Sequence, residues 1–311
     1  MWTGFGLVAL HNLLNILNAF NPAVAALGLD YPIGSIFTER PLNALNDVVF
    51  QHRPEIVGFG YLMPQEIVIS SLVFYALMEM EGVAAVAMGY DIPRFPHFQM
   101  QGGGAFMIFA VILLWMARDT LMRQFRAAFT SRADPMKRFA VFGLLISIVG
   151  VWGWWRAAGM STFTIVLFFG VLFLIALTYD RIRAQTGLPL QWGFPVGRAH
   201  YANMAVFGSA PFKAFGGVRN LTLMHTAWFL TRGYLPNLSA YHFEALHIGE
   251  QARISRREIV IAMLAAILLG VAVSFYVQLD AAYAFGANFL EGGTHQGGMR
   301  VGAARQGFNN L

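Results

Sequence analysis

The sequence contains no cysteine among its 311 residues. A chain without cysteine forms no disulfide bond, thiolate metal site, iron–sulfur cluster or thiol nucleophile. Charge is scarce as well, since Asp, Glu, Lys and Arg make up 12% of the residues, about half of the ~25% typical of soluble domains. So few charged groups cannot cover the surface of a soluble globule of this size. The composition therefore argues against a soluble protein.

Motifs that carry enzyme chemistry are also missing. The sequence has no HExxH, GxSxG, Walker A or dinucleotide-binding pattern. His242 and His247 are five residues apart, which separates them by about 140° around a helix, so they do not share a face as zinc ligands would. We therefore expect no enzymatic activity, no cofactor and no bound metal.

What the sequence has in abundance is apolar residues, at 57% of the chain and a mean hydropathy of +0.55. A bilayer core of ~30 Å needs about 20 helical residues. Five apolar runs come close to that length, at residues 56 to 78, 104 to 122, 139 to 156, 161 to 180 and 258 to 279. The fold class predicted is all-α, a polytopic transmembrane helical bundle of five to seven spans. We expect residues 1 to 311 to form one transmembrane domain.

The net charge of +5 comes from basic residues in short loops beside these runs. Lys and Arg concentrate in cytoplasmic loops of membrane proteins, so this pattern fits membrane topology better than nucleic-acid binding. The connection between the second and third runs holds the largest group, namely Arg118, Arg123, Arg126, Arg132, Lys137 and Arg138. We expect this connection to be cytoplasmic, the next one near Arg156 to be external, and the chain to return inside at Asp180.

Residues 181 to 257 must cross the membrane an even number of times, because basic residues at both ends place both ends in the cytoplasm. The apolar run within this segment, around Leu221 to Leu230, is about half a span. Two alternatives follow for it, a re-entrant element that lines a cavity or a helix on the surface. Residues 239 to 252 are expected to lie along the cytoplasmic interface.

The first 28 residues are apolar but carry a polar stripe. His11, Asn15 and Asn18 fall within about 60° of one another on a helix. A lipid-facing row of amides is costly, so this face should point into the bundle or a wet cavity. Hydrogen bonding between helices and ligand binding by His11 and Asn15 are both open interpretations.

Glu66 is the sharpest single signal. It lies about ten residues into the first apolar run, some 15 Å deep by helix rise and near the bilayer midplane. Pro64 should kink the helix and free backbone carbonyls nearby. The functional interpretation is a proton-relay or substrate-coordinating carboxylate; the alternative is a protonated Glu that bonds a neighbouring helix. By contrast, Glu79 and Glu81 should be solvated at the outer end of this run.

A glycine triplet at Gly102, Gly103 and Gly104 opens the second apolar run. Free amides at a helix N-terminus attract anions such as a substrate carboxylate, and glycine allows a ligand to approach closely. Polar contacts could come from His97, Gln99 and Gln101. The alternative is a flexible turn.

Several stretches carry a family resemblance: FTERP (37 to 41), GFGYLMPQE (58 to 66), FPHFQMQGGGAF (95 to 106), LLWMARDTL (113 to 121) and ALTYDRIRAQTGLP (176 to 189). They resemble a family of uncharacterised prokaryotic polytopic membrane proteins that are peptide-transporter-like and loosely associated with the oligopeptide transporter superfamily. Members of that family are longer, so the resemblance implies that this chain is part of a longer protein in a bacterial or archaeal inner membrane.

The resemblance implies a secondary transporter, with proton coupling as one form of it and with peptides or related small polar solutes as candidate substrates. It assigns no binding residue. The alternative function is that of a structural or accessory subunit in a larger membrane complex, with no transport of its own. Expected partners are the lipid bilayer, a small solute, and further copies or subunits.

Overall fold

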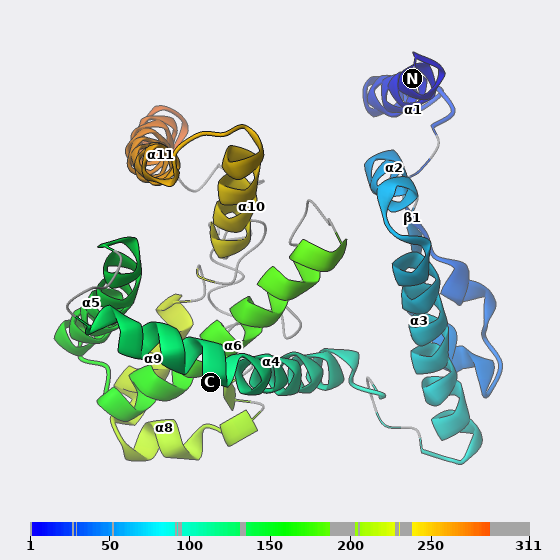
Figure 1. Ribbon diagram of the computed structural model, residues 1–311. Coiled ribbons are helices and arrows are strands. Elements are labelled where there is room, and N and C mark those ends of the chain that lie inside the picture. Colours follow the sequence, from blue (N-terminus) through cyan, green and yellow to red (C-terminus); the bar gives the residue numbers. More distant parts are fainter. Residues whose placement is uncertain are drawn as a thin grey trace. The chain divides into compact units, whose positions relative to one another are not determined.

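A computed structural model of the chain describes residues 2–26, 28, 30–51, 53–90, 92, 95–130, 135–186, 203–204, 206–227, 230 and 238–286. These residues are mostly helical (Figure 1). The described strands, β1 (Asp30–Tyr31) and β2 (Phe50–Gln51), form one short antiparallel pair. The prediction of an all-α fold is confirmed.

Five helices in the described part of the chain are long and apolar enough to cross a membrane. They are α3 (Gln65–Ala87), α4 (Phe98–Ala128), α5 (Pro135–Ala158), α6 (Thr162–Thr186) and α11 (Arg256–Phe285). The last four contain the predicted runs almost entirely. The protein is therefore an integral membrane protein with several spans.

The first predicted run is wrong in its position. The structure divides it between α2 (Pro54–Leu62) and α3, with a break at Met63 and Pro64. Pro64 has no backbone N–H and precedes the first turn of α3 with an extended conformation (ψ 131°). The expected kink within one span is thus a full interruption, and the candidate span begins at Gln65.

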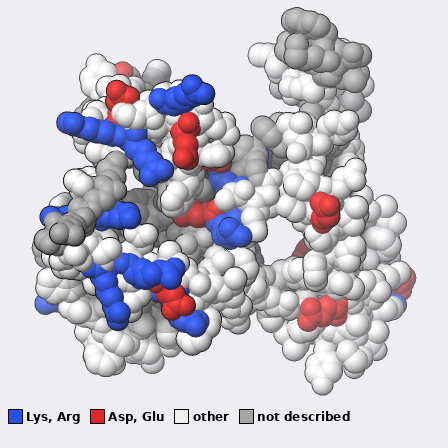
Figure 2. All heavy atoms as spheres, in the orientation of Figure 1, with Lys and Arg blue, Asp and Glu red and all other residues white. Residues whose placement is uncertain are grey.

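The contacts within the chain divide it into two compact units, and the single transmembrane domain expected over residues 1 to 311 stays a prediction. Unit 1 comprises Met1–Phe98 with Gln185–Pro189, and unit 2 comprises Gln99–Ala184 with Leu190–Leu311. Residues 1 to 98 carry three basic and eight acidic residues, whereas residues 99 to 311 carry 18 basic and eight acidic residues. Figure 2 shows this contrast on the viewed face, where Lys and Arg gather on unit 2.

Unit 1 is built around α3. The short helices η1 (Ile33–Ile36) and η2 (Leu42–Leu45) precede it in the chain, and η2 packs against it. This packing covers part of the second half of α3, where Gly82, Val83 and Ala85 are buried. Ala44 and Pro96 lie beside the helix at Gly82, where a Cβ atom would be in ordinary van der Waals contact with both. Helix α1 (Trp2–Phe20) stands at the start of this unit.

Unit 2 is built around α6. The helices α8 (Ala210–Ala214) and α9 (Gly217–Thr226) pack against it. Together they form the main apolar core, which consists of Met160, Ile165, Phe168, Phe169, Phe212, Leu221, Met224 and Ala227. Within the apolar window of each span, 44% of residues are buried in α6, against 0% in α5 and 6% in α11.

Two helices of unit 2 end in the same hydrogen-bond motif. After α5, Gly159 adopts a left-handed conformation (φ 99°), and Met160 N–H donates to the Trp155 carbonyl. After α10 (Leu238–Gln251), Arg253 takes the equivalent position with φ 57°, and Ile254 N–H donates to the Gly249 carbonyl. Glycine is the usual residue at this position, so the arginine is held there against its backbone preference.

Candidate functional site

Glu66, the strongest candidate from the sequence, lies in the first turn of α3. Its side chain is exposed, and the Ser70 hydroxyl donates to its backbone carbonyl. The predicted depth near the midplane of a span is therefore wrong, because the helix that could span starts one residue before Glu66. The carboxylate stands beside the break at Pro64, at one end of the candidate span.

Glu79 and Glu81 occupy the interior of that span instead. Glu79 is 14 residues from the first residue of α3, about 21 Å along the helix. Its side chain is partly buried and shares a hydrogen bond with Tyr75 one turn earlier. The expectation that these two carboxylates lie at the end of the helix is wrong, because α3 continues to Ala87.

The glycine triplet does not open its helix. Helix α4 begins at Phe98, so Gly102, Gly103 and Gly104 lie in its second turn, where their N–H groups bond within the helix. The amides without such partners belong to the first turn, which includes Gln99. The proposed anion contact through the triplet therefore loses its physical basis. Gly103 is buried, and Gln101 is exposed.

The polar stripe of α1 bonds within its own segment. The Asn15 amide lies 3.1 Å from Nε2 of His11, and the Asn18 amide donates to the Val24 carbonyl at 2.7 Å. His11 is buried, with 6% of its surface exposed. These local bonds satisfy amides that the sequence analysis assigned to neighbouring helices or a ligand, and the ligand role of His11 and Asn15 stays a prediction.

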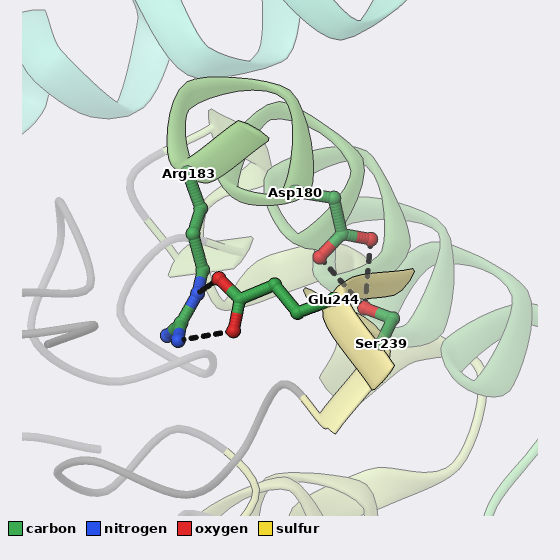
Figure 3. A network of polar contacts seen from close by, with 4 residues as sticks. All are labelled: Asp180, Arg183, Ser239 and Glu244. Atoms are coloured by element: carbon green, nitrogen blue, oxygen red, sulfur yellow. Dashed lines mark hydrogen bonds and ion pairs between the residues drawn. The ribbon is translucent and has the colours of Figure 1, made fainter. Parts of the chain in front are cut away.

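A polar network joins the last turns of α6 to α10 (Figure 3). Nε of Arg183 donates to Oε1 of Glu244 at 2.5 Å, and its Nη2 donates to Oε2 at 2.9 Å. The guanidinium carbon also lies 3.9 Å from the centre of the Tyr241 ring. A two-pronged bond of this kind fixes both distance and orientation. Only 7% of the Arg183 side chain is exposed, against 46% for Glu244.

One turn earlier on α6, Asp180 takes part in the same junction. The Ser239 hydroxyl is 2.7 Å from each carboxylate oxygen of Asp180 (Figure 3). The sequence predicts only that the chain returns to the cytoplasm at Asp180. The structure shows in addition that Asp180 and Arg183 hold α10 against α6.

The opposite end of α6 is held from another part of the chain. Asn220 on α9 is fully buried, accepts a bond from the Ser161 N–H and donates to the Phe212 carbonyl, each at 3.0 Å. Arg219 donates to the Ala158 carbonyl at 2.8 Å. From Ser161 to Arg183 the helix rises about 33 Å. The segment after α6 therefore contacts both ends of that helix, and the re-entrant and surface alternatives for it both stay predictions.

Comparison with known proteins gives a family but no activity. The sequence profile of a family of unknown function, DUF6785, matches residues 1–311. The chain belongs to this family. No curated protein and no solved structure matches it. The description of DUF6785 names no substrate and no link to oligopeptide transporters, so that part of the resemblance stays a prediction.

What this DUF6785 chain can do chemically follows from its charged residues within candidate spans. Groups of three or more His, Asp or Glu side chains that could hold a metal ion are absent from the described residues. At the α6–α10 junction carboxylates are paired with Arg183 and Ser239, whereas the sequence of α3 holds three glutamates and no arginine or lysine. Carboxylates within an apolar membrane helix are costly, so those of α3 are the candidates for a functional role.

Proposed function

We propose that the protein forms part of a proton-coupled secondary transporter for peptides or related small polar solutes in a bacterial or archaeal inner membrane. The observation that carries this proposal is the acidic character of α3. This candidate span holds Glu66, Glu79 and Glu81 and no basic residue. Ionisable residues within membrane spans are rare because they are costly, and they mark proton relays and solute paths.

The break between α2 and α3 supports the same function. Transporters build their solute sites where a helix is interrupted, since the freed backbone groups there can bind a solute or an ion. Met63 and Pro64 form such an interruption, and Glu66 follows it directly. In this proposal Glu79 exchanges the proton within the span, and Glu66 lies beside the solute.

The test is a flux measurement on purified protein in vesicles. A pH-sensitive dye inside the vesicles reports proton entry when a mixture of di- and tripeptides is added under an inward proton gradient. We expect peptide-dependent acidification by the natural protein and its loss in Glu79→Gln and Glu66→Gln. Glu39→Gln is the matched control, because Glu39 is an exposed carboxylate outside the candidate spans.

Two results would contradict the proposal. One is a natural protein that shows no peptide-dependent proton entry although its circular dichroism is helical. The other is full coupling in both glutamine variants. A peptide flux that persists in Glu79→Gln without proton entry would keep the transport function and remove the coupling.

The second candidate function, an accessory subunit, rests on a different observation. In the apolar windows of α5 and α11, 0% and 6% of the residues are buried, so almost all of their apolar surface faces outward. Such surface fits either lipid or a partner protein. A subunit predicts that crosslinking in native membranes joins this chain to another polypeptide. Transport by the isolated chain would argue against it.

A further inference from the structure

An open groove of about 800 Å³ lies between α10 and α11. One wall is formed by Leu238, Tyr241, His242 and Ala245 of α10. The other wall is a stripe on α11 that runs from Met263 to Gln278 in steps that alternate between three residues and one. Most of the lining is aliphatic or aromatic. The stripe is about 22 Å long by helix rise, which fits a hydrocarbon chain laid along the helix.

Three arginines stand where this groove approaches the start of α11. Arg256 precedes Met263 by seven residues, so it continues the same stripe of the helix. Arg257 follows it, and Arg253 lies in the turn between α10 and α11. All three are exposed. Figure 2 shows blue side chains gathered over the part of unit 2 where Figure 1 places α10 and α11.

Acidic residues offset this charge only in part. Glu250 lies 3.7 Å from Arg256, and Glu258 is engaged with Ser255 at the start of α11. Among the residues that the structure describes, neither Arg253 nor Arg257 forms an ion pair. The end of the groove thus combines free positive charge with an apolar channel that leads into the candidate span.

We propose that this groove binds one anionic phospholipid of the cytoplasmic leaflet. One of its acyl chains lies along the α11 stripe, and its phosphate contacts Arg253, Arg256 and Arg257. An amphipathic anion matches a surface that is basic at one end and apolar along its length, since basic pockets between helices on the cytoplasmic side recognise acidic headgroups. Another protein helix would match the apolar stripe but would leave the arginines without a counter-charge. The proposal is independent of the transport function.

The experiment uses a phosphatidylglycerol with a photoreactive diazirine in its acyl chain. The lipid is a minor component of phosphatidylcholine vesicles that contain the full chain, and crosslinked peptides are mapped by mass spectrometry. We expect crosslinks at the groove stripe of α11 and not at Leu268, an exposed residue of α11 outside the groove lining. Phosphatidylcholine with the same diazirine should label the stripe about tenfold less, because it lacks the net negative charge.

Two substitutions remove the charge without a folding penalty. Arg253→Gly places glycine at a left-handed position, so this variant should unfold at a higher temperature than the natural protein. Arg257→Gln changes an exposed side chain. We expect the double variant to lose about tenfold in labelling by the anionic lipid. Arg123→Gln with Arg126→Gln is the matched control, because these exposed arginines lie at the end of α4.

A third variant tests the groove itself. Gly270 lines it, and a Cβ atom built there meets nothing within 4 Å, so we expect the leucine of Gly270→Leu to occupy the groove. Labelling should fall, whereas Gly150→Leu on α5 should have no effect. Equal labelling by both lipids, or labelling spread evenly around α11, would overturn the proposal. The proposal would also be overturned if the groove stayed unlabelled by lipid and a second polypeptide were crosslinked to its lining instead.

Discussion

Helices α6 and α11 are both strongly apolar candidate spans, yet the rest of the chain buries them to very different extents. Their mean hydropathies are 2.3 and 2.6. In α6, 44% of the residues in the apolar window are buried by the rest of the chain, whereas in α11 the share is 6%. The more hydrophobic helix is thus the more exposed one. Hydropathy accounts for the entry of both helices into a membrane and says nothing of which helix becomes the centre of the protein.

Polar residues explain the difference. Helix α6 buries Thr178 and Arg183, and each of them bonds a distant part of the chain. The Thr178 hydroxyl donates to the Phe106 carbonyl of α4 at 2.7 Å, and Arg183 pairs with Glu244 of α10. Helix α11 is capped locally, by a reciprocal pair of bonds between Ser255 and Glu258. Because lipid offers no hydrogen bonds, polar side chains within a span select the helix that other protein segments surround.

The largest expected effect comes from matched truncations on the two helices. Ile175 on α6 has 0% of its surface exposed, and Ile261 on α11 has 55%. We expect Ile175→Ala to lower the free energy of unfolding by about 3 kcal/mol, because a close-packed site is left with a cavity. Ile261→Ala should cost less than about 1 kcal/mol, since lipid refills the space. Denaturant titration in mixed micelles measures both, and equal losses would show that α11 is covered by protein as well.

A smaller effect is expected from two arginine–glutamate pairs. Glu244→Ala leaves the buried Arg183 guanidinium without its carboxylate. Glu250→Ala breaks a pair whose two side chains are 69% and 70% exposed. We expect a loss of about 2 kcal/mol for Glu244→Ala, below the usual range for a buried pair because Glu244 itself is 46% exposed. Glu250→Ala should change stability by less than about 0.5 kcal/mol. The same unfolding titration applies, and Glu244→Gln, which keeps an acceptor oxygen, should recover part of the loss.

The spans were predictable from sequence because they depend on local composition. The predicted run 258 to 279 falls within α11, and the run 161 to 180 begins one residue before α6 and ends within it. The limits of the first span were predicted wrongly, because the interruption at Met63 and Pro64 separates two helices of similar hydropathy. A proline within an apolar run permits either a kink or a break, and tertiary contacts decide between them.

The polar contacts of the site were not predictable, because they join residues that are distant in the sequence. Arg183 and Glu244 are 61 positions apart, and Asp180 and Ser239 are 59 apart. One signal was present, namely charged residues within the last turns of an apolar helix, which call for a partner. The prediction that the glycine triplet opens a helix failed because the helix begins four residues earlier, at Phe98.

The smallest expected effects compare how the two helices begin. Asn220→Ala removes the bonds that tie the start of α6 to α9, and Ser255→Ala removes the cap of α11. We expect each substitution to lower the free energy of unfolding by about 1 kcal/mol, but only Asn220→Ala should loosen contacts beyond its own helix.

The chain has no cysteine, so Met160→Cys, at a fully buried position, provides a unique reporter. Maleimide labelling of this cysteine should accelerate in Asn220→Ala, because the α5–α6 turn loosens. It should stay unchanged in Ser255→Ala, since that cap serves only its own helix. Acceleration in both variants would mean that the starts of α6 and α11 are coupled, and the contrast between a helix anchored by distant residues and one anchored by its own cap would fail.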